Sequence, residues 1–368
     1  MPRHRSFVLV IFLSMWWFHS PGWAQGEKAD TTRGFLTLPE ILKILTESKT
    51  IYNILPLDST DIPREKFLEV YYPEVRPHTE YPWIEIRGDS SIILREYECG
   101  EDAWEAIKVA EEHFFKKEYS RALEHYERAM AASESCYVAY LLAGDCYLMV
   151  DQPERALDYY LRAKKLNPYD YRVYFFSATA HMKLGQPDLA VENYIRALTF
   201  KPRHKNILEP LSSIQQELGI KIYDNSLHPA AVVQKGKDGA INIYVSLKKE
   251  DRMWMAFAMA KALYLGEPDF GGGKEDSPRV FWTSREEKQA IFSLMETYLS
   301  MRENNEIPPV PELDRLKKII QDGYLEEYIL YELASRMVPD VVLQSGPLVW
   351  KRVEAYIRKY VVVQEKSP

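Results

Sequence analysis

The sequence is poor in the residue types that most often carry out chemistry. Of its 368 residues, eight are histidine and three are cysteine, and neither type occurs after His228. The C-terminal segment therefore cannot supply a His or Cys metal site, a Ser-His-Asp triad or a Cys-His pair. The earlier histidines show no HxxxH or HExxH spacing. We expect no metal site and no cofactor.

The chain also lacks an excess of basic residues. Its 47 Lys and Arg against 54 Asp and Glu give a formal charge of −7, so it offers no general attraction to a phosphate backbone. We expect no nucleic-acid partner. Beyond residue 24 no stretch approaches the roughly 18 apolar residues that a membrane-spanning helix needs, which predicts no transmembrane anchor in the mature chain.

Residues 1–24 have the order of a secretory signal peptide. Two arginines precede the apolar run Phe7–Phe18, and a small residue, Ala24, stands at a possible cleavage site. As a helix this run would span about 18 Å, well short of the roughly 30 Å of bilayer hydrocarbon. The pattern predicts cleavage after Ala24 and a periplasmic or secreted protein of the cell envelope.

An internal repeat of 34 residues fills residues 103–202 without a gap. Small residues at positions 8, 20 and 27 of each copy allow two antiparallel helices to approach closely, and a tyrosine at position 24 fills the space between them. These positions hold Ala110, Gly144 and Ala178; Ala122, Ala156 and Ala190; Ala129, Ala163 and Ala197; and Tyr126, Tyr160 and Tyr194. The pattern predicts three helix hairpins.

This segment resembles the tetratricopeptide repeat family in its period and in its pattern of positions. Pro153 and Pro187 suit the first turn of a second helix, and Pro168 and Pro202 stop that helix. The resemblance implies an α-solenoid. Apolar residues at helical spacing continue up to Gly219, and we interpret them as the capping helix that a solenoid needs.

The flanks predict a mostly α protein with small strand elements. A polar linker and a small α+β element should occupy residues 25–102, with a helix over Leu38–Leu45 and a hairpin of residues 83–87 and 92–97. After the repeats and cap (103–219), residues 220–368 should form a mostly helical domain. Its entrance is a hairpin of residues 231–233 and 241–247, and its helices are expected at 253–265, 285–301, 312–320, 325–337 and 348–362.

Carboxylates are the remaining candidates for catalysis. Glu286–Glu287 and Glu326–Glu327 are adjacent pairs, but neighbouring side chains on a helix point about 100° apart. Neither pair would converge on one bond, and both are expected to lie on solvated faces.

The three cysteines leave one disulfide open as a possibility. Cys136 and Cys146 are about 15 Å apart along one helix, too far for a bond. Cys99 and Cys136 each precede the first helix of neighbouring repeats, so a bridge between them is geometrically allowed. The alternative is that Cys136 and Cys146 are buried as small apolar residues.

In the family, positions 2, 5, 6, 9, 12 and 13 of the first helices line a concave groove, and the resemblance implies the same here. Repeat 1 then contributes Trp104, Ile107, Lys108, Glu111, Phe114 and Phe115; repeat 2 contributes Val138, Leu141, Leu142, Asp145, Leu148 and Met149; repeat 3 contributes Arg172, Phe175, Phe176, Thr179, Met182 and Lys183. The Lys at position 5 and Asn at position 9 that clamp a C-terminal carboxylate in some members are absent. An apolar or aromatic segment fits better, and Leu141 and Phe175 should lie at the centre of the face.

The sequence therefore predicts a non-enzymatic protein-binding or assembly scaffold of the bacterial cell envelope. The partner is a protein or peptide, or the groove is filled by the protein's own flanking segments. The alternative is an envelope enzyme with a carboxylate-based site in residues 220–368, to which the repeats recruit substrate.

We predict that the mature protein begins at Gln25. N-terminal sequencing of the protein purified from its cells checks this directly, because Gln25 is the first residue after the predicted cut. Retention of Phe7–Phe18 would mean an anchored protein.

Overall fold

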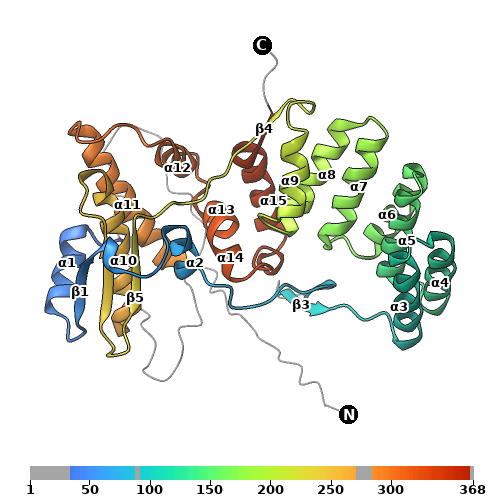
Figure 1. The fold of residues 1–368 in the computed structure, drawn as a ribbon, viewed down its shortest axis with the longest axis horizontal. Coiled ribbons are helices and arrows are strands. Elements are labelled where there is room, and N and C mark those ends of the chain that lie inside the picture. Colours follow the sequence, from blue (N-terminus) through green and yellow to red (C-terminus); the bar gives the residue numbers. More distant parts are fainter. Residues whose placement is uncertain (1–33, 88–91, 271–283, 365–368) are drawn as a thin grey trace.

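The structure is a computed structural model that describes residues 34–87, 92–270 and 284–364. The predicted signal peptide, residues 1–24, lies outside the described residues. Figure 1 shows a solenoid of paired helices at one end, a small sheet covered by helices at the other, and the last helices of the chain between them. Among the described residues, no helix is both long and apolar enough to cross a bilayer.

The three predicted helix hairpins are confirmed. They are α3 (Glu101–Phe115) with α4 (Tyr119–Ala132), α5 (Tyr137–Met149) with α6 (Pro153–Leu166), and α7 (Tyr171–Lys183) with α8 (Pro187–Phe200). Close packing requires the small residue at position 8: a Cβ on Gly144 would lie 2.5 Å from the ring of Tyr160. That distance is far below van der Waals contact, so only glycine fits against this tyrosine.

The capping helix is shorter than expected, and a second element shares its role. Helix α9 (Lys205–Ser213) contains Pro210 and ends six residues before Gly219. Residues 214–219 form turns and do not continue the helix. Helix α15 (Pro347–Tyr356) also packs against α8. The ring of Trp350 lies 5.7 Å from that of Phe200 and 5.0 Å from that of Tyr169. The last repeat is therefore closed by the C-terminal segment as well as by α9.

The three-stranded sheet joins two distant parts of the chain. Strands β5 (Ala231–Lys235) and β6 (Ile241–Val245) form the predicted antiparallel hairpin, and β1 (Tyr52–Pro56) pairs parallel to β6. Two N-terminal helices also pack against this later part of the chain. Helix α1 (Leu38–Glu47) packs on α10 (Arg252–Gly266), and helix α2 (Phe67–Tyr71) packs on β5.

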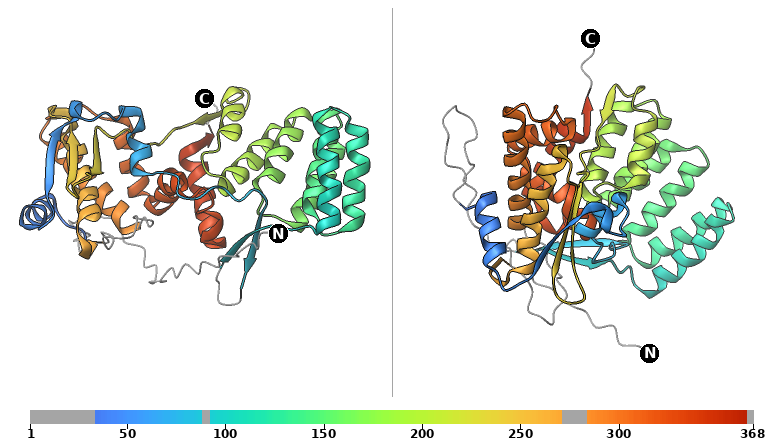
Figure 2. Two further views of the ribbon diagram at one scale, coloured as in Figure 1. Left: turned by 60° about the horizontal axis from the view of Figure 1, so that its bottom comes forward. Right: turned by 60° about the vertical axis from the view of Figure 1, so that its left-hand side comes forward.

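The N-terminal flank is thus divided in a way that differs from the expected domain division. Its first part completes the C-terminal domain, because β1 needs the hydrogen bonds of β6 and α1 needs the apolar surface of α10. Its second part contains the predicted hairpin of β2 (Pro82–Ile86) and β3 (Ile92–Glu96), which pair antiparallel. Figure 2 shows this hairpin between the solenoid and the C-terminal helices.

The remaining predicted helices are present, two of them with irregular ends. After α10 come α11 (Ser284–Glu303), α12 (Pro311–Gln321), α13 (Leu325–Tyr328) with α14 (Ser335–Met337), and α15. Wider π-helical turns occupy Ile329–Ala334 and Ile357–Val361. Strands β4 (Ile220–Ile222) and β7 (Val362–Gln364) pair antiparallel and bring the end of the domain back to its beginning.

The prediction that the glutamate pairs are solvated is wrong for three of the four side chains. Glu286 and Glu287 are 6% and 0% exposed, and Glu327 is 3% exposed and bonded to Arg352. Lys261 of α10, itself 4% exposed, forms ion pairs with both Glu286 and Glu287. This cluster cannot be predicted from the local sequence. The lysine lies in an apolar helix and contacts its partners only because α10 packs against α11.

Removing the charge of Lys261 should destabilise the fold severely. The pKa of Glu287 is raised by burial although Lys261 opposes the shift, and Lys261→Met would remove the cation that pairs with the fully buried Glu287 carboxylate. We expect a loss of about 3–5 kcal/mol in the free energy of unfolding at pH 7.5, measured by urea denaturation.

The matched control is Lys43→Met, which removes an exposed lysine from α1 and should change stability by less than about 0.5 kcal/mol. The loss in the free energy of unfolding caused by Lys261→Met should become smaller as the pH is lowered, because a protonated carboxyl carries no charge to be compensated. A deficit below about 1 kcal/mol at pH 7.5 would contradict the structural role of this cluster.

Candidate functional site

The concave face of the solenoid is more closely packed than the family positions imply. Ile107, Val138 and Leu141 are at most 1% exposed, so they cannot meet a partner. Leu141 belongs to the buried cluster that also contains Tyr160 and Val173. The expectation that Leu141 lies open at the centre of the face is therefore wrong, because position 5 is used here to pack the repeat.

The N-terminal edge of the face is covered by the segment before the repeats. We call residues 75–87 and 92–99 the strap. Its backbone accepts a hydrogen bond at Glu80 from Arg172 (2.9 Å) and at Pro82 from the Asn167 side chain (2.8 Å). The hydroxyl of Tyr97 donates to the carbonyl of Ser135 at 2.6 Å. The strap therefore contacts the residues at the starts of α5 and α7.

Aromatic contacts also join the strap to repeat 1. The rings of Tyr81 and Trp104 are 5.1 Å apart, and the guanidinium of Arg172 lies 4.4 Å from the centre of the Tyr81 ring. Arg172 also donates to the fully buried carboxylate of Asp170, with Nε–Oδ1 at 3.0 Å and Nη2–Oδ2 at 2.5 Å. Trp104 and Arg172, both expected in the groove, are thus engaged by the protein itself.

Cys99 anchors the end of the strap. It forms a disulfide with Cys136, with Cα atoms 5.0 Å apart, and Cys146 is a buried free thiol. The bridge that the sequence left open is therefore present, and it fastens the strap to the residue that precedes α5.

The other half of the face presents exposed apolar side chains. At position 13, Phe115 is 80% exposed and Met149 is 55% exposed. The third residue at this position, Lys183, is exposed and pairs with Asp151 at 2.8 Å. Further residues are partly exposed or exposed: Lys108, Leu142, Phe175, Phe176 and Met182. An apolar strip therefore remains open where the strap does not reach.

Between the covered and open halves lie the residues at position 9. Burial raises the pKa of Asp145 to about 7, although the Tyr160 hydroxyl, donating at 2.7 Å, opposes the shift. Burial also raises the pKa of Glu111. The hydroxyl of Thr179 donates to the carbonyl of Phe175. The middle of the face therefore carries two carboxyl groups with an increased tendency to bind a proton.

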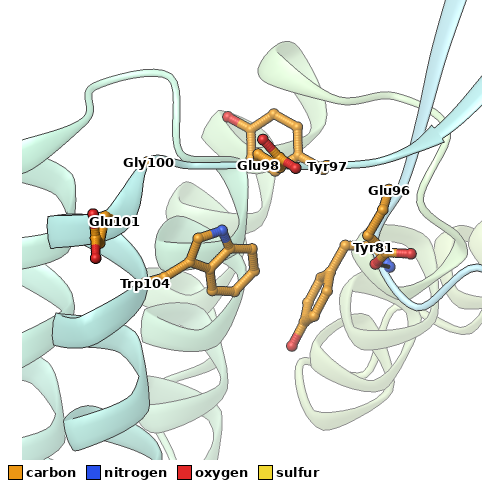
Figure 3. A pocket seen from close by; sticks show the side chains of 7 residues that line it. All are labelled: Tyr81, Glu96, Tyr97, Glu98, Gly100, Glu101 and Trp104. Carbon is orange, nitrogen blue, oxygen red and sulfur yellow. Dashed lines mark hydrogen bonds between the residues drawn. The ribbon is translucent and has the colours of Figure 1, made fainter. Parts of the chain in front are cut away.

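A pocket of about 380 Å³ opens where the strap meets α3 (Figure 3). Its walls combine aromatic and acidic side chains: Tyr81, Tyr97 and Trp104 with Glu96, Glu98 and Glu101, and Gly100 completes the lining. Of these residues the sequence pointed to Trp104 alone. Tyr81, Glu96, Tyr97 and Glu98 belong to the strap, whose place against the solenoid no local pattern reveals, and Gly100 and Glu101 stand at the start of α3, before the first position of the repeat. Across residues 34–87, 92–270 and 284–364, no cluster of three or more His, Cys, Asp or Glu could hold a metal ion.

Residues 171–204, which span α7 and α8, match the sequence model of the tetratricopeptide repeat. The solenoid is an array of tetratricopeptide repeats. Such repeats indicate a protein-interaction or scaffold function. No curated protein matches the chain.

Solved tetratricopeptide-repeat structures resemble about a third of the chain. The first such domain of human RPAP3 is 21% identical, with a TM-score of 0.31, and covers 32% of this chain and 92% of its own. The domain of Arabidopsis OM64 is 15% identical, with a TM-score of 0.31, covering 32% and 96%. The Yersinia enterocolitica type III secretion chaperone SycD, solved with a peptide of the translocator YopD, is 18% identical, with a TM-score of 0.30, covering 33% and 96%.

Asp145→Asn should remove a pH-dependent loss of stability. A carboxyl whose pKa is about 7 in the folded state and about 4 when unfolded binds its proton more tightly in the folded state. The free energy of unfolding therefore falls as the pH rises through this range. Thermal midpoints are measured from pH 4 to pH 7.5. The midpoint of Asp145→Asn minus that of the wild type should increase as the pH rises.

The exposed Asp158 of α6 provides the control, since Asp158→Asn should give a curve parallel to that of the wild type. Parallel curves for Asp145→Asn as well would show that Asp145 does not titrate in this range.

Proposed function

We propose that this chain is a polypeptide-binding scaffold that holds an apolar or aromatic segment on the open half of its concave face. The exposure of Phe115 and Met149, equivalent residues of adjacent first helices, carries the proposal. Exposed apolar residues grouped along one face of a soluble protein are typical of a binding surface. Burying each side chain would stabilise a complex by about 1.5–3 kcal/mol.

The proposed site uses part of the face because the strap occupies the rest. Tyr81 already stacks on Trp104, and Arg172 is bonded to Asp170 and to the strap. The flanking segment and an external partner are therefore compatible occupants of two different halves. A segment on the open half meets α3 and α5 near their C-terminal ends.

We also propose that the protein is exported and acts in the bacterial cell envelope. The leader pattern of residues 1–24 supports export. The Cys99–Cys136 disulfide supports it independently, because such bonds persist mainly in oxidising compartments.

The proposed role is non-catalytic. Of the carboxylate pairs considered as candidates for catalysis, Glu286 and Glu287 are buried against Lys261, and Tyr72 donates to Glu287 at 2.6 Å. Lys261 thus pairs with both carboxylates inside the core. We therefore ascribe this cluster to stability.

Phe115→Glu combined with Met149→Glu should abolish capture of an apolar segment. Ligands are selected from a phage-displayed random-peptide library on the immobilised wild-type protein, and enriched peptides are measured by fluorescence anisotropy. The double variant should bind them about 100-fold or more weakly. Its melting temperature should stay close to that of the wild type, because both side chains face water.

Leu161→Glu is the control, since Leu161 is 51% exposed on α6, a second helix of the solenoid. It should leave peptide affinity unchanged. Equal weakening by the control, or unchanged binding by the double variant, would move the binding site off the open half of the face.

A further inference from the structure

The pocket between the strap and α3 has walls suited to a cation. Three aromatic rings and three carboxylates line it, and its lining contains no lysine or arginine. Aromatic faces attract ammonium and guanidinium groups through the negative potential of the ring, and carboxylates add charge-assisted hydrogen bonds. We propose that this pocket binds an arginine or lysine side chain of the polypeptide held on the open half of the face, an inference that rests on the proposed function.

The charges around the pocket favour a cation after the neighbouring positive groups are considered. The N-terminus of α3 contributes about half a positive charge, against the carboxylates of Glu96, Glu98 and Glu101. Arg172 lies against Tyr81, but its charge is matched by the buried Asp170. The local balance therefore remains negative.

The walls are held in place before any ligand binds. The Tyr81 backbone N–H donates to Glu96 at 2.7 Å, and its ring packs on Trp104. Tyr97 is fixed by its bond to Ser135 and by its ring contact with Tyr137 at 4.8 Å. Figure 3 shows the rings of Tyr81, Tyr97 and Trp104 around one space. A preformed site of this kind loses little freedom on binding.

The volume is sufficient for the proposed group. A cavity of about 380 Å³ lies within the usual range of small-ligand sites. It accommodates a guanidinium or ammonium group together with part of its aliphatic stem, which can pack along the indole of Trp104.

The distance to the open half sets the spacing in the partner. Trp104 and Phe115 lie on the same helix, so their backbone positions are about 16 Å apart. An extended segment covers this distance in about five residues. The partner should therefore carry its basic residue about five positions from an apolar anchor.

The first test uses N-acetyl-arginine amide and its uncharged counterpart N-acetyl-citrulline amide with the mature chain. Binding is followed by the NMR signal of the Trp104 indole N–H, assigned with Trp104→Phe. The arginine probe should shift this signal saturably, with an affinity about tenfold or more above that of the citrulline probe. Equal affinity, or no saturable shift with either probe, would overturn the proposal.

Glu98→Gln combined with Glu101→Gln should weaken the arginine probe about tenfold by removing two carboxylates at exposed positions. The control is Glu105→Gln, an exposed position of α3 outside the pocket lining, which should bind as the wild type does. Undiminished binding by the pocket double variant would contradict the assigned role of these glutamates.

A synthetic peptide with arginine five positions from a phenylalanine distinguishes a polypeptide ligand from a free cation. It should bind about tenfold or more tightly than either the arginine probe or the same peptide with citrulline. No gain over the arginine probe would overturn the polypeptide assignment. A separate experiment tests the proposed function. The Phe115→Glu and Met149→Glu double variant changes the open half of the face and leaves the pocket glutamates in place.

Discussion

The parallel pairing of β1 with β6 is the constraint on which the rest of the structure depends. It brings residues 52–56 to residues 241–245, so along the chain the repeats are inserted between two segments that fold together. The chain must then cross from that domain to the first repeat, and the strap makes this crossing. Val75 donates to the carbonyl of Met337 at 2.9 Å, and Asp340 accepts from the backbone of Thr79 at 2.8 Å. The solenoid is therefore held by the strap along the starts of its first helices and by α15 at its last repeat.

This double attachment has a consequence for binding. A solenoid whose repeats touch only their neighbours can change its curvature, whereas the strap connects positions at the starts of three successive first helices. Arg172 fixes this connection because its charge is matched by Asp170, which also accepts a hydrogen bond from Tyr137 at 3.0 Å. The concave face is thus preorganised, and a bound segment need not supply the energy to shape it.

The sequence predicts what is local and fails where distant segments meet. The repeat, both hairpins and every long helix follow from spacings within about 40 residues, because small residues, prolines and apolar periodicity act locally. Strand β1 offered no such signal: Tyr52–Pro56 is short, contains Asn53 and pairs with a strand far along the chain. The prediction for Leu141 was wrong because position 5 of the repeat is buried here in the cluster that contains Tyr160 and Val173. Glu287 was misplaced because its partner Lys261 lies on another helix.

The disulfide links the proposed location of the protein to its proposed binding surface. Cys99 ends the strap and Cys136 precedes α5, so their bond keeps Tyr97 close to Tyr137 and Ser135. Tyr97 is one wall of the acidic aromatic pocket, and Tyr81, paired through the backbone with Tyr97, is another. The Cys99–Cys136 bond, of a kind that is stable in oxidising compartments, therefore adds to the hydrogen bonds and ring contacts that hold both walls. In a reducing compartment the same residues would be held by ring contacts and hydrogen bonds alone.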